Sequence, residues 1–185
     1  VGSIKKIIKV AEIIKSYKKK KNNVIVVSSA MSGVTNELVK KSKGISENFS
    51  DEEYDVLVSS GEQVACSLIA GRLIHEGLKS RSWLAWQIPI VTKGSHKNSR
   101  ISHINKKKIL KYIGEGGVPI ITGFQGIDNH QRITTIGRGG SDATAIMIAK
   151  FLNAEKCIIY TDVEGVYTTD PNKFKKAKKI KTISY

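Results

Sequence analysis

Three short, mostly apolar runs, far apart in the chain, constrain the fold most strongly. They are Val24–Ser28, Val118–Thr122 and Lys156–Thr161. Strands that are apolar on both faces are typical of parallel sheets covered by helices on both sides. We therefore expect each run to form a buried strand. Because parallel strands are joined by long crossovers, the segments between the runs should supply helices.

Helical periodicity does occupy those segments. Ile4, Ile7, Ala11 and Ile14 repeat at helical spacing behind Ser3, which we predict to be the N-cap. Further helices are expected from about Thr35 and at Asp51–His75, Asn105–Ile113 and Ala143–Leu152, and further strands at Ser80–Trp86 and Ile133–Ile136. The alternation predicts an α/β fold, a mostly parallel sheet with helices on both faces, and no domain boundary within residues 1–185.

The charge balance suggests a nucleic-acid partner but is better explained by a solvated surface. The 185 residues include 31 Lys and Arg against 16 Asp and Glu, a formal charge of +15. The lysines cluster at the ends of the expected elements, and aromatic residues, at 6%, do not alternate with them as a single-strand stacking groove requires. We therefore do not expect nucleic acid as a partner. We also expect no membrane partner, because no run of 18 apolar residues exists.

The cysteines and histidines show no catalytic or metal-binding pattern. Cys66 and Cys157 both lie in apolar surroundings and lack metal-type spacing, so we expect buried thiols, no metal site and a reducing, cytoplasmic location. No histidine can be paired with a Ser or Cys nucleophile, which argues against nucleophilic hydrolysis. The four histidines are expected in surface or turn positions.

The glycine-rich stretch Thr134–Ala145, T-T-I-G-R-G-G-S-D-A-T-A, is the most informative motif. Glycines directly before a helix allow a ligand to approach the backbone, and the helix N-terminus favours an anion. Arg138 adds a planar cation suited to a carboxylate or phosphate. The alternative is an ordinary turn in which Ser141 or Asp142 caps the helix. The stretch is neither a Walker motif nor a dinucleotide fingerprint.

Other polar groups follow the expected strands. Small hydroxyl residues and a glycine follow the first strand in V-S-S-A-M-S-G-V-T-N, and Thr161 and Asp162 follow the third, unless they only form a β-turn. Glu62 interrupts an apolar helix in S-S-G-E and needs a cation or a capping role. Because the carboxyl ends of parallel strands meet at one edge, we expect a polar, phosphate-tolerant cleft there.

These motifs, in this order and spacing, resemble aspartate kinase over the whole chain. They are V-S-S-A-M-S-G-V-T-N, S-S-G-E, T-G-F-Q-G, T-T-I-G-R-G-G-S-D-A-T-A and Y-T-D-V-E-G-V-Y-T-T-D-P. The resemblance implies the amino-acid kinase fold, a three-layer αβα sandwich. It also implies transfer of a phosphoryl group from ATP, with Mg²⁺, to the β-carboxylate of L-aspartate. The product, 4-phospho-L-aspartate, opens the route to lysine, threonine, methionine and diaminopimelate.

The resemblance also implies roles for individual residues. Glu62 and Arg138 would hold the ammonium and α-carboxylate of aspartate, with Ser29 and Thr35 beside it. Gly139, Gly140 and Ser141 would line the phosphate path, and Asp142 would organise the catalytic centre. Thr161, Asp162 and Tyr167, with Lys173 nearby, would contact ATP. No residue is expected to bind a metal directly.

The resemblance departs from the family pattern at several points. Lys97 and Ser99 replace residues of an H-G-N-A-R pattern, and Val1 follows directly on the position where the family has a K-F-G-G-[TS]-S strand. We therefore expect a catalytic domain that is incomplete at both ends, inactive alone and homo-oligomeric in the full-length protein. The alternatives are a non-catalytic remnant that keeps the fold or nucleotide binding, and another amino-acid kinase.

Overall fold

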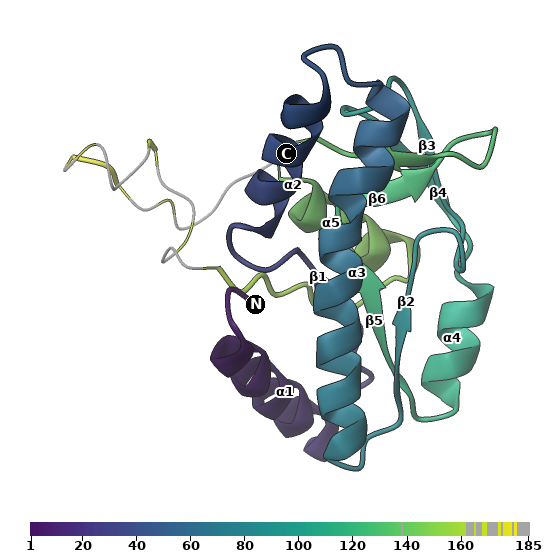
Figure 1. Cartoon of the computed structure of the whole chain (residues 1–185). Coiled ribbons are helices and arrows are strands. Elements are labelled where there is room, and N and C mark those ends of the chain that lie inside the picture. Colours follow the sequence, from purple (N-terminus) through teal and green to yellow (C-terminus); the bar gives the residue numbers. More distant parts are fainter. Residues whose placement is uncertain are drawn as a thin grey trace. The chain divides into compact units, whose positions relative to one another are not determined.

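The computed structural model describes residues 1–137, 139–161, 165, 168–169, 174, 176–178 and 180. The chain divides into two units, Val1–Glu155 and Lys156–Tyr185. The described helices and strands all belong to the first unit (Figure 1). The helices are α1 (Ile4–Lys19), α2 (Val34–Ile45), α3 (Asp51–His75), α4 (Lys107–Gly114) and α5 (Gly140–Phe151). The strands are β1 (Val26–Ser28), β2 (Ser80–Trp83), β3 (Ile90–Lys93), β4 (Arg100–Ile104), β5 (Val118–Thr122), β6 (Gln125–Ile127) and β7 (Ile133–Thr135).

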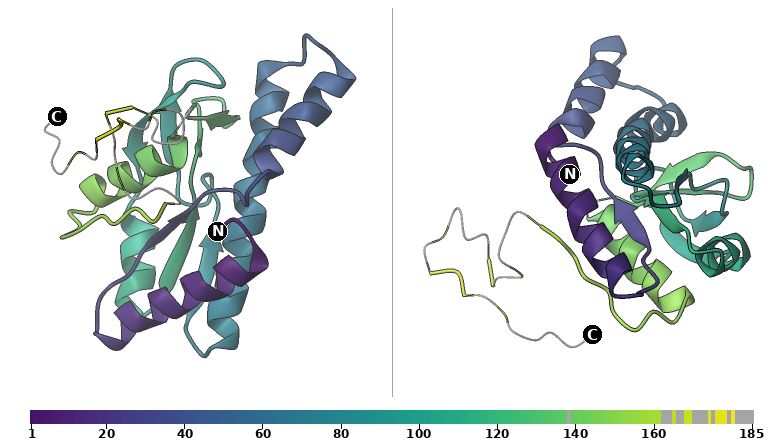
Figure 2. Two further views of the ribbon diagram at one scale, coloured as in Figure 1. Left: turned by 90° about the vertical axis from the view of Figure 1, so that its left-hand side faces the viewer. Right: turned by 90° about the horizontal axis from the view of Figure 1, so that it is seen from below.

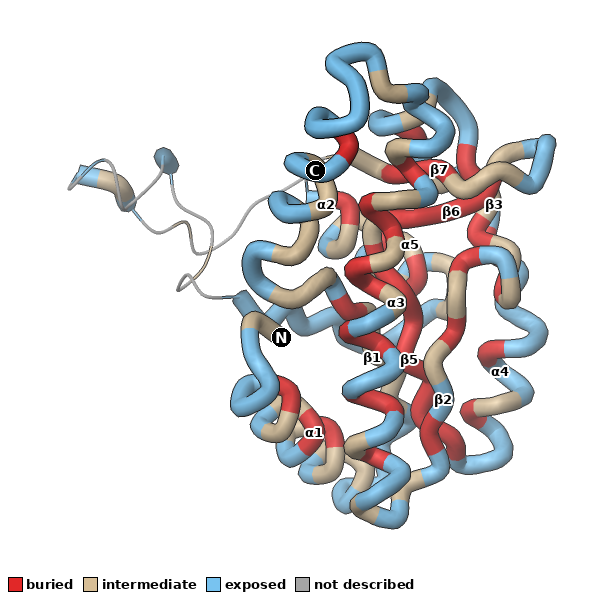
Figure 3. Tube along the Cα trace, in the orientation of Figure 1, coloured by how far each residue is buried: buried red, intermediate tan, exposed pale blue. Residues whose placement is uncertain are grey.

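Two sheets organise the first unit. The first is entirely parallel, in the order β1-β5-β2, and its central strand β5 is buried at all five positions (Figure 3). The second has the order β4-β3-β6-β7, in which β3 and β6 are parallel and the outer pairs are antiparallel. The predicted α/β fold with a mostly parallel sheet is confirmed.

The core lies on both faces of β5. Val118 and Ile120 pack against apolar residues of α1 and α3. Ile121 belongs to a separate cluster that includes Ile113 of α4 and Ile148 of α5. The strands are therefore sandwiched between α1 and α3 on one side and α4 and α5 on the other (Figure 2). This burial on both faces explains why these strands are apolar at consecutive positions.

Helix α3 begins and ends where the sequence predicts. Ser50 caps its first turn, which carries three acidic residues, and the chain leaves through Gly77 at φ 81°. The predicted N-cap of α1 is also confirmed, since Ser3 Oγ accepts a hydrogen bond from the N–H of Lys6 at 3.3 Å. Although α3 has 25 residues, no described helix is both long and apolar enough to cross a bilayer.

Two predictions about strands are corrected. Residues 156–161 form no strand, and Cys157, expected to be buried, is exposed. An apolar run is buried only where neighbouring elements cover it, and the described residues of the Lys156–Tyr185 unit include neither a helix nor a strand. The expected strand Ser80–Trp86 ends at Trp83, because the next residues form a turn in which the N–H of Leu84 donates to the side chain of Gln87.

The spacing of β3 and β6 requires a glycine at position 126. A Cβ atom there would lie 2.3 Å from Cγ2 of Thr92 and 2.7 Å from the backbone oxygen of Ile90. We expect Gly126→Ala to destabilise the protein by about 1–3 kcal/mol, as overpacking does. Gly71→Ala, on the exposed side of α3 with open space around it, should instead stabilise by roughly 0.5–1 kcal/mol. Urea denaturation of both variants tests this, and equal effects would contradict the packing argument.

Candidate active site

A cavity of about 770 Å³ gathers most of the residues that the sequence indicated. Seven predicted residues line it, namely Ser29, Thr35, Glu62, Gly139, Gly140, Ser141 and Asp142. They come from the turn after β1, the start of α2, the middle of α3 and the start of α5. The structure therefore brings together side chains that lie more than 100 residues apart in the chain.

The remaining predicted residues are not placed at this cavity. Arg138, Asp162, Tyr167 and Lys173 lie outside the described residues. Thr161 belongs to the Lys156–Tyr185 unit, whereas the cavity is formed by residues of the first unit. The nucleotide contacts expected of Thr161, Asp162, Tyr167 and Lys173 therefore stay predictions.

The glycine-rich turn places the N-terminus of α5 at the cavity. Gly137 and Gly139 have φ values of 62° and 70°, which glycine adopts without strain. Helix α5 begins at Gly140 with Gly139 as its N-cap and no side-chain cap. The alternative in which Ser141 or Asp142 caps a helix starting at Ala143 is therefore wrong. The first N–H groups of a helix lack intrahelical acceptors, so this end suits an anionic ligand.

The turn between β5 and β6 fixes α5 in this position. The N–H of Gly123 donates to the carbonyl of Ser28, and the N–H of Phe124 donates to Oγ1 of Thr144 on α5 at 3.2 Å. Thr144 in turn donates to the carbonyl of Gly140 at 2.7 Å. A Cβ at Gly140 would lie 2.7 Å from the Phe124 ring, so the close approach of the turn and the helix depends on this glycine.

Glu62 is a buried carboxylate with an unused oxygen. Its Oε1 accepts a hydrogen bond from the N–H of Ala30 at 3.0 Å, whereas Oε2 is buried and has no hydrogen-bond partner among the residues that the structure describes. Burial raises the pKa of Glu62 to about 7, although the bond from Ala30 partly opposes the increase. A Cβ at Gly61 would lie 2.8 Å from Cβ of Ala30, so Gly61 lets the turn after β1 reach this carboxylate.

Asp55 is a second buried carboxylate on α3, and it is fully hydrogen-bonded. Its oxygens accept from the N–H of Lys97, from the N–H and Oγ1 of Thr135, and one lies 2.7 Å from Nδ1 of His96. It thereby joins α3 to the β3–β4 connection and to the end of β7. Thr135 and Lys97 both line the cavity, so Asp55 positions two segments of its wall. His96 lies in a turn, as expected, but is held by this carboxylate.

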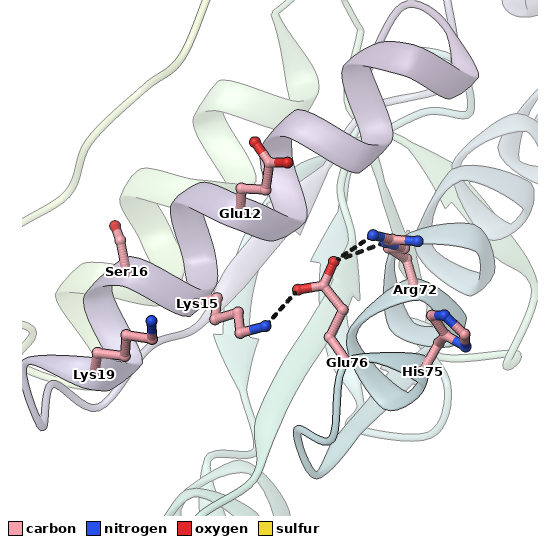
Figure 4. Close-up of a pocket in the computed structure, with 7 residues that line it drawn as sticks. All are labelled: Glu12, Lys15, Ser16, Lys19, Arg72, His75 and Glu76. Atoms are coloured by element: carbon pink, nitrogen blue, oxygen red, sulfur yellow. Dashed lines mark hydrogen bonds and ion pairs between the residues drawn. The ribbon is translucent and has the colours of Figure 1, made fainter.

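A smaller cavity, of about 480 Å³, lies between α1 and α3 and has a different character (Figure 4). Glu76 forms ion pairs there with Lys15 at 3.2 Å and with Arg72 at 2.7 Å. The hydrogen bond from Lys15, and then that from Arg72, lowers the pKa of Glu76. None of the predicted site residues that the structure describes lines this cavity. Because Glu76 pairs with Lys15 of α1 and with Arg72 of α3, we interpret it as a contact between two helices.

Sequence reasoning missed several residues of the larger cavity. They are Asn36, Val39, Tyr54, Lys97, Phe124 and Thr135, whereas Gly137 belongs to the glycine-rich stretch that the sequence indicated. The apolar surroundings of Asp55 in Y-D-V-L-V carried the same signal as those of Glu62 and could have identified it.

Cys66 does lie buried as predicted. Burial, and then the charge of Glu62, raises the pKa of its thiol to about 12, which makes the thiol unreactive. Within the described residues no group of three His, Cys, Asp or Glu side chains could hold a metal ion.

Comparisons with known proteins show which family the chain belongs to. Residues 2–185 match the model of the amino acid kinase family. The chain is 48% identical to an aspartokinase from Bacillus sp. (strain MGA3) over its whole length, which is 45% of that protein. It thus spans about half the length of the curated relatives it matches.

Two solved structures extend the comparison. E. coli aspartokinase III in complex with aspartate and ADP is 25% identical with a TM-score of 0.82, covering 97% of this chain and 51% of that one. Aspartate kinase from Synechocystis is 39% identical with a TM-score of 0.78, covering 96% of this chain and 29% of that one.

The hydrogen bonds of Asp55 predict a large cost for its removal. Asp55→Ala leaves buried donors on Thr135 unpaired, so we expect a loss of about 3–5 kcal/mol in the free energy of unfolding. Asp128 accepts two backbone N–H groups in an exposed turn, and Asp128→Ala should cost only about 1 kcal/mol. Urea denaturation compares the two variants. A cost at Asp55 no greater than that at Asp128 would show that the Asp55 network contributes little.

Proposed function

The chain belongs to the amino acid kinase family, and we propose that it carries the catalytic site of an aspartate kinase. The reaction is phosphoryl transfer from ATP to the β-carboxylate of L-aspartate, which yields 4-phospho-L-aspartate. The similarity to aspartokinases along the whole chain supports this proposal. The E. coli relative, whose structure contains aspartate and ADP, supports the choice of both substrates. The product would open the route to lysine, threonine, methionine and diaminopimelate.

The observation that carries the proposal is the state of Glu62. A buried carboxylate oxygen without a partner is costly unless a ligand satisfies it. With respect to the described residues, Oε2 of Glu62 is such an atom, and its side chain lines the cavity. The ammonium group of an amino acid supplies both the charge and the hydrogen-bond donors that this atom lacks. The cavity is therefore suited to a ligand that carries an ammonium group.

The start of α5 would receive the phosphate groups. The glycine turn at Gly137 and Gly139 leaves the backbone open to close approach, and the helix N-terminus attracts negative charge. We assign Gly139, Gly140 and Ser141 to the path of the transferred phosphoryl group. Because this end of α5 and Glu62 line the same cavity, an amino acid held at Glu62 would lie beside the transferred group.

The reaction needs positioning more than proton transfer. The nucleophile is a carboxylate with a pKa near ~3.9, so it is already ionised at neutral pH and requires no general base. Catalysis then depends on alignment and on neutralising the charge of the migrating group. In this scheme Arg138 holds the α-carboxylate, Ser29 and Thr35 lie beside the substrate, and Asp142 organises the catalytic centre.

The nucleotide and its metal complete the proposal. Thr161, Asp162, Tyr167 and Lys173 are the proposed ATP contacts. Magnesium is commonly held by substrate phosphates and one or two carboxylates. The sequence predicted no direct metal ligand, but Asp142, in the first turn of α5, brings a carboxylate to the cavity that would be suited to this role. When bound, the ion would neutralise charge on the phosphates. The expected assembly into a homo-oligomer stays a prediction.

A trapping assay tests the proposed reaction in the native protein. An acyl phosphate reacts with hydroxylamine to give a hydroxamate, which forms a coloured complex with Fe(III). We expect hydroxamate from L-aspartate with ATP and Mg²⁺, none from L-asparagine, and none when EDTA removes the metal. Product from another amino acid but not from aspartate would indicate a different kinase of the family. Nucleotide binding without any product would indicate a non-catalytic protein.

The raised pKa of Glu62 predicts opposite pH dependences for stability and binding. Between pH 4.5 and about 7, Glu62 is protonated to a greater extent in the folded protein than in the unfolded chain, so its contribution to stability should fall as the pH rises, by roughly 2–4 kcal/mol in total. Over the same interval the carboxylate ionises, so L-aspartate should bind more tightly at pH 8 than at pH 6. Urea denaturation and calorimetric titration measure the two trends.

Glu62→Gln should remove both trends, because the amide does not titrate. Glu115→Gln is the matched control, since Glu115 is exposed and pairs with Lys79 away from the cavity. The control should keep both trends. If Glu62→Gln retains the loss of stability between pH 4.5 and 7, another group causes it and the assignment to Glu62 is wrong.

A further inference from the structure

Lys97 is held in a strained backbone conformation at the cavity. It lies between β3 and β4 with φ 64°, a left-handed value that side chains other than glycine rarely adopt. Its N–H donates to both carboxylate oxygens of Asp55, each at 3.1 Å. The next residue, Asn98, would lie 3.0 Å from a Cβ at Gly137, so this connection packs directly against the glycine-rich turn. The surrounding structure therefore fixes the position from which the Lys97 side chain extends.

Among the described residues, the side chain of Lys97 has weak partners. Its ammonium forms an ion pair with Asp51 and lies 4.6 Å from the centre of the Tyr54 ring. The Lys97 and Asp51 side chains are 42% and 61% exposed. Exposed pairs of this kind contribute about 0–1 kcal/mol, so an anionic ligand can compete for the lysine. The four-carbon stem lets the ammonium move while the backbone stays in place.

The charges that line the cavity show what Lys97 would offer a ligand. Among the described residues that line it, Lys97 is the only cation, whereas Glu62 and Asp142 are acids. Aspartate carries one ammonium and two carboxylates. With the ammonium assigned to Glu62 and the α-carboxylate to Arg138, one carboxylate is left for a second cation. Asp55, which holds the backbone of Lys97, precedes Glu62 by seven residues on α3, about 10 Å along the helix axis. The Lys97 side chain can span much of the distance between Asp55 and Glu62. The gap that is left between the Lys97 ammonium and the Glu62 carboxylate has room for a small amino acid.

We propose that Lys97 is a substrate-binding residue whose ammonium leaves Asp51 and binds a carboxylate of the amino acid held at Glu62. This inference rests on the proposed function. It predicts that Lys97 contributes to the affinity for the amino acid and leaves the affinity for the nucleotide unchanged.

Calorimetric titration of the native protein with L-aspartate and, separately, with MgATP tests the assignment. Lys97→Met keeps the length of the side chain and removes its charge, so aspartate should bind about tenfold more weakly, while MgATP affinity should not change. Lys79→Met is the matched control, because Lys79 has the same two kinds of partner. Its ammonium forms an ion pair with Glu115 and lies 5.3 Å from the centre of the Tyr112 ring. The control should bind both ligands as the unmodified protein does.

A second variant removes the competing carboxylate instead. Asp51→Asn frees Lys97 and should leave aspartate binding as tight or make it tighter, whereas weaker binding would contradict the proposal. Unchanged aspartate affinity in Lys97→Met, or a loss confined to MgATP, would also overturn it. Neither result would contradict the proposed function. The proposed function would be contradicted if the unmodified protein did not bind aspartate at all.

Discussion

The burial of two carboxylates on one helix is the constraint on which the site depends. Asp55 and Glu62 lie seven residues apart on α3, and neither can remain buried at low cost without partners. Asp55 finds its partners within the protein, and in doing so it fixes the end of β7 and the connection between β3 and β4. Glu62 accepts the N–H of Ala30 at Oε1, but its Oε2 has no partner within the described part of the chain. The same helix therefore carries one carboxylate that builds the cavity and one that is left for a ligand.

Another part of the cavity wall depends on backbone geometry more than on side chains. Three glycines, at positions 137, 139 and 140, let the chain leave β7, pass the Phe124 turn and enter α5 without steric conflict. The cavity is thus lined by both a buried carboxylate and a helix N-terminus. That polarity matches a ligand pair made of an ammonium compound and a phosphate donor, because each charge meets the group that stabilises it.

The sequence predicted the fold well wherever local patterns are sufficient. The bounds of α3 follow from its caps and its acidic first turn, and the strand β5 follows from its apolar run. Strands β3, β4 and β6 were not predicted. In β4, R-I-S-H-I, polar residues interrupt the pattern, because this strand lies at a sheet edge. Lys97 could not be assigned to the cavity from sequence, since its place depends on the pairing of its backbone with Asp55, 42 residues away. The Lys156–Thr161 run shows that apolarity alone does not make a strand.

The central claim is that the buried carboxylate of Glu62 binds a cationic group of the ligand, and the pKa of this carboxyl can be measured directly. Carbon-13 NMR of the Glu62 side-chain carboxyl, assigned with the Glu62→Gln variant, gives its pKa in the free protein and in the presence of saturating L-aspartate. The account predicts a pKa of about 7 in the free protein, raised by burial, and a clear decrease when the ammonium of the ligand binds beside it. A pKa that stays the same when aspartate is bound would contradict the account.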